Sequence, residues 1–112
     1  MNPVKAPIDT VATIQREVAA FYGLHHTAML SRARPDHIAH PRQVAMCLAR
    51  ELTRLSLAEI GLYFGGRDHG TIIHATVAVR NRAETNLHYA TELHAVWARV
   101  VEAVHGVHIR SA

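Results

Sequence analysis

The sequence predicts an all-α fold, a helical bundle of about five to six helices that contains a helix-turn-helix. Apolar residues recur three and four positions apart along most of the 112-residue chain, which is typical of helices with one buried face. Capping residues, glycines and prolines divide the chain into pieces of helix length. No segment combines apolar/polar alternation with a hairpin turn, so we expect no β-strands.

The helices are expected, in order, over residues 10–22, 27–30, 41–53, 56–64, 68–82 and 86–105. Asp9 or Thr10 can cap the first helix, and Gly23 is suited to end it in a left-handed conformation. A polar, basic loop is predicted over residues 31–40. Pro41 follows it, where the first turn of a helix tolerates the missing N–H of proline. We expect a lead over residues 1–7, one domain over 8–105 and a tail over 106–112.

The second half of the chain has clearer sequence signals for where helices begin and end. Ser56 and Glu59 form the sequence pattern of a capping box, which opens a short helix. Gly65-Gly66 interrupts that helix, and Asp68 or His69 begins the next one. In the last helix the predicted buried face consists of Leu87, Leu93, Val96, Trp97 and Val100.

Composition excludes several classes of protein. No apolar run approaches the eighteen or so residues of a membrane span, and the start of the chain lacks the apolar core of a signal peptide. The single cysteine, Cys47, lies in an apolar run and is expected to be a buried side chain in a reducing compartment. We therefore expect a cytoplasmic protein that has no membrane contact.

Two short helices joined by a glycine-containing turn, over residues 56–64 and 68–82, are typical of a helix-turn-helix. In such units the first residues of the second helix meet base edges in the major groove of DNA. These predicted readers are small or polar, which suits close approach to DNA: Asp68, His69, Gly70, Thr71, His74 and Ala75.

The distribution of charge supports this interpretation more than the total does. The formal net charge is only +3, but residues 32–82 hold eight arginines and four acidic residues, a net charge of +4. The rest of the chain carries a net charge of −1. Arginines in this segment, Arg32 among them, can contact phosphates with two hydrogen bonds. The alternatives at this point are a protein–protein module and a helical bundle with solvated arginines.

One extended pattern narrows the interpretation. It consists of Pro41-Arg42-Gln43-Val44-Ala45-Met46, then Arg50-Glu51-Leu52-Thr53, then Ser56-Leu57-Ala58-Glu59-Ile60-Gly61, then the continuous run from Phe64 to Ala75. This order of motifs closely resembles the C-terminal DNA-binding domain, domain IV, of the bacterial replication initiator DnaA. The resemblance covers about residues 8–103, and the final helix matches only in pattern. It implies an all-helical domain that binds a short asymmetric duplex site, the DnaA box, as a monomer.

The resemblance also implies roles for individual residues. Arg34 matches the loop arginine that enters the minor groove, and Arg42 and Gln43 match residues that lie close to the DNA. Residues at or near positions that hold the phosphate backbone are Arg50, Thr53, Ser56, Leu57 and Arg67.

Two departures from the family pattern bear on specificity. Gly70 replaces a threonine, which removes a major-groove contact and implies a relaxed or shifted sequence preference. The neutral stretch 76–79 replaces a basic pair, which implies fewer phosphate contacts and a smaller salt dependence. We expect Arg80 and Arg82 to compensate for the lost basic pair in part.

The sequence thus predicts a stand-alone regulator that binds duplex DNA at DnaA-box-like sites and acts in transcription or in replication initiation. It contains no phosphate-binding loop motif, so we expect no ATPase or other enzymatic activity, no cofactor and no small-molecule substrate. The replication or transcription machinery is the expected further partner, and DNA binding implies association with the nucleoid. The alternative is a protein-interaction module derived from the same domain, with weakened or lost sequence-specific binding.

The ten histidines do not predict a metal site, because they are scattered and lack the spacing of zinc ligands. Their expected effect is tighter DNA binding near pH 6, where protonation adds positive charge close to phosphates.

Overall fold

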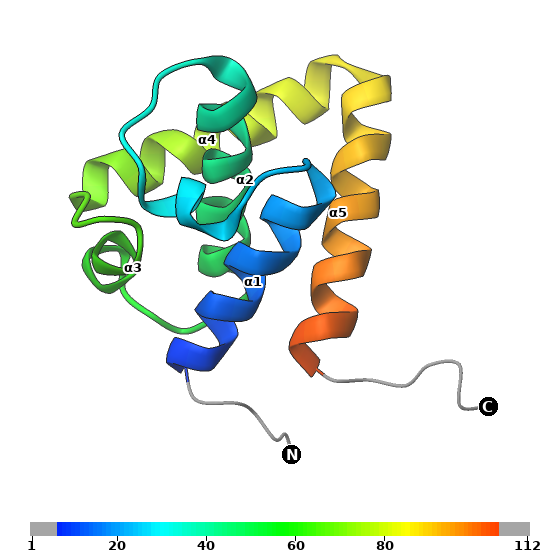
Figure 1. Cartoon of the computed structure of the whole chain (residues 1–112). Coiled ribbons are helices and arrows are strands. Elements are labelled where there is room, and N and C mark those ends of the chain that lie inside the picture. Colours follow the sequence, from blue (N-terminus) through cyan, green and yellow to red (C-terminus); the bar gives the residue numbers. More distant parts are fainter. Residues whose placement is uncertain (1–6, 106–112) are drawn as a thin grey trace.

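The computed structural model describes residues 7–105, which form five α-helices and one short 3-10 helix without any β-strand (Figure 1). In chain order the elements are α1 (Pro7–Phe21), η1 (His26–Leu30), α2 (Asp36–Leu52), α3 (Leu57–Tyr63), α4 (His69–Thr85) and α5 (Leu87–His105). The all-α prediction is confirmed. Residues 1–6 of the predicted lead and the whole predicted tail lie outside the described residues. No helix in this part of the chain has the length and apolarity to cross a membrane.

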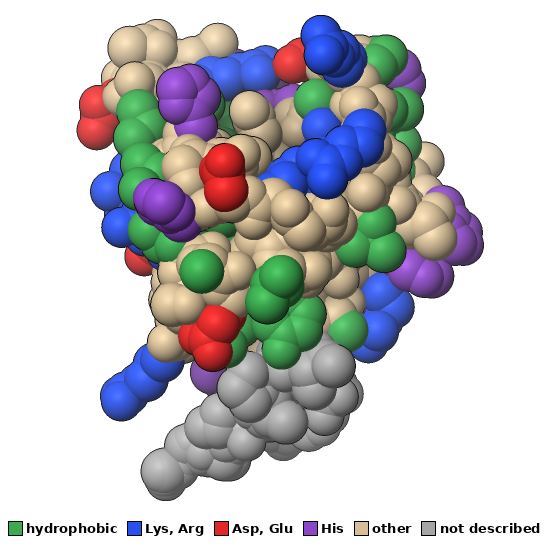
Figure 2. Space-filling view, turned by 90° about the vertical axis from the view of Figure 1, so that its left-hand side faces the viewer, with side chains coloured by type: hydrophobic (Ala, Val, Ile, Leu, Met, Phe, Trp, Pro, Cys, Tyr) green, Lys and Arg blue, Asp and Glu red, His purple; other side chains and the backbone are tan. Residues whose placement is uncertain are grey.

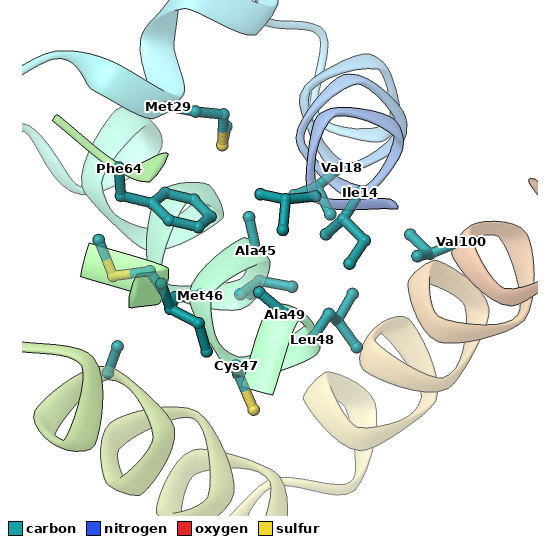
Figure 3. Packing of buried hydrophobic residues seen from close by; sticks show 14 of the residues in the cluster. Ile14, Val18, Met29, Ala45, Met46, Cys47, Leu48, Ala49, Phe64 and Val100 are labelled. Atoms are coloured by element: carbon teal, nitrogen blue, oxygen red, sulfur yellow. The ribbon is translucent and has the colours of Figure 1, made fainter. Parts of the chain in front are cut away.

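Helix α2 forms the centre of the core. All six side chains from Val44 to Ala49 are at most 6% exposed, so this helix is buried around most of its circumference. Apolar side chains from the other elements surround it, as Figure 3 shows, among them Ile14, Val18, Met29, Phe64 and Val100. Cys47 is buried as predicted, and burial raises the pKa of its thiol. Helix α4 packs against α2, which therefore supports the second helix of the helix-turn-helix.

The predicted start of α2 is wrong. The helix begins at Asp36 rather than Pro41, and the Pro35 carbonyl accepts hydrogen bonds from the amides of Ile38 and Ala39 at 3.0 and 2.8 Å. Pro41 lies in the second turn, where it removes one helical hydrogen bond. That loss concerns the carbonyl of His37, an exposed residue, so water can replace the missing donor.

The predicted cap of the first helix is wrong, because α1 begins at Pro7 and contains both Asp9 and Thr10. The other predicted caps are confirmed. Gly23 adopts φ +72° just after α1, where the next amide, of Leu24, donates to the Ala19 carbonyl at 2.8 Å. Ser56 caps α3 in a complete capping box: the Glu59 amide donates to Ser56 Oγ at 3.1 Å, and the Ser56 amide donates to Glu59 Oε1 at 2.8 Å. Asp68 caps α4.

Helix α5 covers α1 and the end of α4 (Figure 1). Val96 and Val100 are buried as predicted, and Leu93 and Trp97 are partly buried against the core. The prediction that Leu87 belongs to this face is wrong, because Leu87 is 84% exposed. It is the first residue of the helix.

A polar cluster joins the ends of four helices. Tyr89 of α5 and the buried His40 of α2 share a hydrogen bond of 2.8 Å between the phenol oxygen and Nε2. Arg82 of α4 lies 4.5 Å above the centre of the Tyr89 ring, and Tyr22 donates to Glu92 at 2.8 Å. Burial lowers the pKa of His40, and the positive charge of Arg82 lowers it further.

Candidate nucleic-acid interface

The helix-turn-helix consists of α3, the turn over residues 64–68 and α4. The carbonyl of Gly61 holds the turn, since it accepts hydrogen bonds from the amides of Phe64, Gly66 and Arg67 at 3.1, 3.1 and 2.9 Å. The turn needs two left-handed residues, which Gly65 and Gly66 supply with φ near +80°. This geometry leaves the first turn of α4 at the surface.

Asp68 is both the cap of α4 and a predicted base reader. Its Oδ1 accepts the Thr71 amide at 3.0 Å and the Thr71 hydroxyl at 3.2 Å. These hydrogen bonds lower the pKa of Asp68, so the carboxylate is charged at neutral pH. A negative charge at this position repels phosphate and can accept only from base amino groups, which suits readout of base edges.

A surface groove of about 400 Å³ lies between α2 and the first half of α4. Its lining contains every predicted base reader except Arg34 and His69, together with Met46 and Arg67. The lining residues are Arg42, Gln43, Met46, Arg67, Asp68, Gly70, Thr71, His74 and Ala75. Residues from two helices, about thirty positions apart in the sequence, therefore share one concave surface.

The groove has a buried floor and exposed walls. Gly70, Thr71 and His74 are exposed, whereas Ala75 is only 1% exposed and Met46 is equally buried. Sequence reasoning did not identify Met46 as a lining residue, because its position in an apolar run predicted only burial. His69 is exposed at the start of α4 but does not line the groove.

The residues predicted to contact phosphate or the minor groove differ in their surroundings. Arg34, the predicted minor-groove arginine, and Arg50 are exposed and make no hydrogen bond or ion pair with other described residues. Thr53 and Ser56 are engaged in the connection between α2 and α3, where their side chains bond backbone groups. Leu57 is partly buried at the start of α3.

Three further arginines bond to backbone carbonyls. Arg42, 8% exposed, donates to the Ala33 carbonyl at 3.0 Å. Arg32 donates to the Gly65 carbonyl at 2.9 Å, and Arg67 donates to the Ser31 carbonyl at 2.7 Å. Their guanidinium groups therefore have partners within the chain. In Figure 2, which shows the side of the molecule that carries the start of α4, arginine and histidine side chains are interspersed with acidic ones across the upper part.

The neutral stretch 76–79 is exposed at its two middle positions, whereas Thr76 and Val79 are buried. Val77 is 50% exposed, and Ala78 is also at the surface. Arg80 and Arg82, which are expected to compensate in part, are both exposed, and each has a partner within the chain. Arg80 forms an ion pair with Glu51 at 2.7 Å, and Arg82 lies over the Tyr89 ring.

The part of the chain that the structure describes contains no group of three or more histidine, cysteine, aspartate or glutamate side chains that could hold a metal ion. The arrangement is instead a concave, arginine-bordered surface beside an exposed helix N-terminus, which is suited to an anionic polymer whose edges carry hydrogen-bonding groups.

Comparison with known proteins identifies the family of the chain. Residues 11–79 match the family model described as the bacterial dnaA protein helix-turn-helix. The chain is 47% identical over 85 residues to the chromosomal replication initiator protein DnaA of Burkholderia multivorans and to those of Paraburkholderia phymatum and Burkholderia vietnamiensis. These matches cover 76% of this chain but only 16% of each relative. Because the family model covers more than half of its length, the chain belongs to the bacterial DnaA helix-turn-helix family.

Proposed function

We propose that this chain binds duplex DNA at DnaA-box-like sites, with the first turn of α4 in the major groove. The observation that carries the proposal is the groove between α2 and α4, which brings Gln43, Thr71 and His74 onto one surface. The family match supports DNA binding in general. The groove adds hydrogen-bonding side chains at the position where a recognition helix meets base edges.

The partly exposed Gln43 and the exposed Thr71 and His74 each have a chemistry that a base edge can satisfy. Gln43 can form paired hydrogen bonds with adenine, and the Thr71 side chain offers a hydroxyl and a methyl group. His74 can donate to a purine acceptor. The exposed guanidinium groups of Arg34 and Arg50 are available for the minor groove and for phosphate respectively.

We further propose a regulatory role, in which the bound chain occupies such sites as a monomer and modulates transcription or replication initiation. The test is competition on a box-containing duplex between this chain and a DnaA initiator. Displacement of the initiator at concentrations near the chain's own Kd supports the role. Simultaneous binding of both proteins to one box would contradict it.

Binding specificity is tested by fluorescence anisotropy with a box-containing duplex and a scrambled duplex of the same composition, over a range of salt concentrations. We expect tighter binding to the box, and affinity for both duplexes that falls as salt rises. His74→Ala should weaken binding to the box by a factor of about 5–150, the range for loss of a base contact of 1–3 kcal/mol.

His88→Ala is the matched control, because His88 is an exposed histidine of α5 outside the groove. It should leave both affinities unchanged. Equal affinity of the parent chain for the two duplexes would contradict sequence-specific binding. That result would favour the alternative of a protein-interaction module.

A further inference from the structure

Two arginine side chains, those of Arg67 and Arg32, attach the loop before α2 to the turn of the helix-turn-helix. Arg67 donates to the carbonyls of Phe64 and of Ser31, the latter at 2.7 Å. Arg32 reaches in the opposite direction, from the loop to the Gly65 carbonyl at 2.9 Å. These hydrogen bonds join residues more than thirty positions apart, so they set where the loop lies relative to α4.

Arg42 fastens the same loop to α2. Its guanidinium donates to the Ala33 carbonyl at 3.0 Å and to Ser31 Oγ at 3.4 Å. Because Ser31 Oγ also accepts the Ala33 amide at 3.3 Å, the loop backbone around residues 31–33 is held from both sides.

The turn itself approaches the loop closely. A Cβ atom added to Gly65 would lie 2.8 Å from the Leu30 carbonyl oxygen, which is too short for an ordinary contact. The backbone at the end of η1, directly before the loop, is therefore packed against the backbone of the turn, with no side chain between them at that point.

The chemistry of this contact needs arginine. None of the three guanidinium groups forms an ion pair within residues 7–105, where the described ion pairs involve other arginines. Burial lowers the pKa of Arg67, and the nearby charges of Arg42 and Arg32 lower it further. Placing like charges together costs free energy, which the hydrogen bonds to carbonyls offset. The planar guanidinium group of arginine can donate to two carbonyls at once, whereas a lysine ammonium cannot reproduce that geometry.

We propose that Arg67 and Arg42 are positioning residues, which hold the 31–35 loop so that Arg34 reaches the minor groove while α4 lies in the major groove. The proposal rests on the proposed function. It assigns these two arginines a role different from the phosphate and base contacts that the sequence predicts for them. Arg67 then affects the affinity for the box through the position of the loop, without contacting DNA itself.

The decisive variant is Arg67→Lys, which keeps the positive charge but loses the planar guanidinium group with its paired donors. If Arg67 positions the loop, binding to the box duplex should weaken about tenfold, the size of one or two lost hydrogen bonds, with an unchanged salt slope. If Arg67 instead contacts phosphate, Arg67→Lys should bind normally, and Arg67→Ala should reduce the salt slope by about one. That second pattern would overturn the proposal.

A double-mutant cycle with Arg34→Ala tests whether Arg67 acts through Arg34. In the Arg34→Ala background, Arg67→Lys should weaken binding less than about twofold, because the arginine it positions is already absent. Fully additive losses would contradict the proposal. Arg16→Lys, a change at an exposed arginine of α1 outside the groove, serves as the matched control and should bind like the parent chain.

A measurement without DNA separates this proposal from the proposed function. Amide hydrogen exchange should accelerate at Ser31 and Ala33 in Arg67→Lys and Arg42→Lys, while amides of the α2 core keep their protection. Unchanged exchange at these two amides would refute the positioning role even if the chain binds its box. Accelerated exchange in a chain that fails to discriminate between duplexes would refute the proposed function alone.

Discussion

Gly61 offers a sharp test of how the helix-turn-helix is held together. A Cβ atom at this position would lie 1.8 Å from the carbonyl oxygen of Arg67 and 2.9 Å from its carbonyl carbon. Both are backbone atoms, so no side-chain rotation can relieve the overlap. Gly61→Ala must therefore push the turn, and with it the start of α4, away from α3.

The expected cost can be estimated from the contacts that change. Overpacking of this kind costs about 1–3 kcal/mol. The displacement also weakens the three hydrogen bonds that the Gly61 carbonyl accepts, each with a net contribution of about 0.5–1.5 kcal/mol. The higher helix propensity of alanine stabilises the folded state by about 1 kcal/mol and offsets part of this loss. We expect a net loss of about 2–4 kcal/mol, which a domain of ordinary stability survives in the folded state.

Urea unfolding followed by circular dichroism measures this loss. Gly70→Ala is the matched control, since a Cβ there would meet only Asp68 Oδ1, at 3.4 Å. That variant should gain about 0.4–1 kcal/mol, because alanine restricts the unfolded chain. A free energy of unfolding for Gly61→Ala within about 0.5 kcal/mol of the parent would refute the close backbone approach, given the usual precision of such measurements.

Three further predictions follow from particular contacts. Ser56→Ala removes the capping box of α3 and should cost about 1 kcal/mol in urea unfolding, whereas Thr91→Ala, at an exposed position within α5, should be nearly neutral. Because the pKa of His40 is lowered in the folded state, protonation favours the unfolded chain: stability should be constant above about pH 7 and fall by up to about 1.4 kcal/mol per pH unit below about pH 6.5. His40→Gln should flatten that decline, and equal pH profiles for the two chains would show that His40 is not responsible. Gly70→Thr should sharpen discrimination between the box and variant boxes in selection from random duplexes, and an unchanged selected motif would show that Gly70 does not relax the specificity.

Much of the local structure could be predicted because its causes are local. The capping box at Ser56 and the left-handed Gly23 depend on residues within a few positions, so sequence spacing alone identifies them. The order of motifs through the helix-turn-helix likewise indicated the family, which the match over residues 11–79 confirms. The predicted start of α2 was wrong because it relied on Pro41 as the signal. The pair Pro35-Asp36, which lies earlier in the chain, also suits a helix start, and the helix begins there.

The sequence by itself thus determined the all-α class, the helix-turn-helix and a set of candidate reading residues. Only the tertiary structure decided which of them share a surface: Gln43 and His74 meet in one groove because α2 and α4 pack together. It also decided the partners of Arg32, Arg42 and Arg67. In sequence these are basic residues like any others, and only the folded chain brings the carbonyls of the loop and the turn within their reach. Helix signals depend on neighbours along the chain, whereas an arginine's partner depends on which distant backbone folding places beside it.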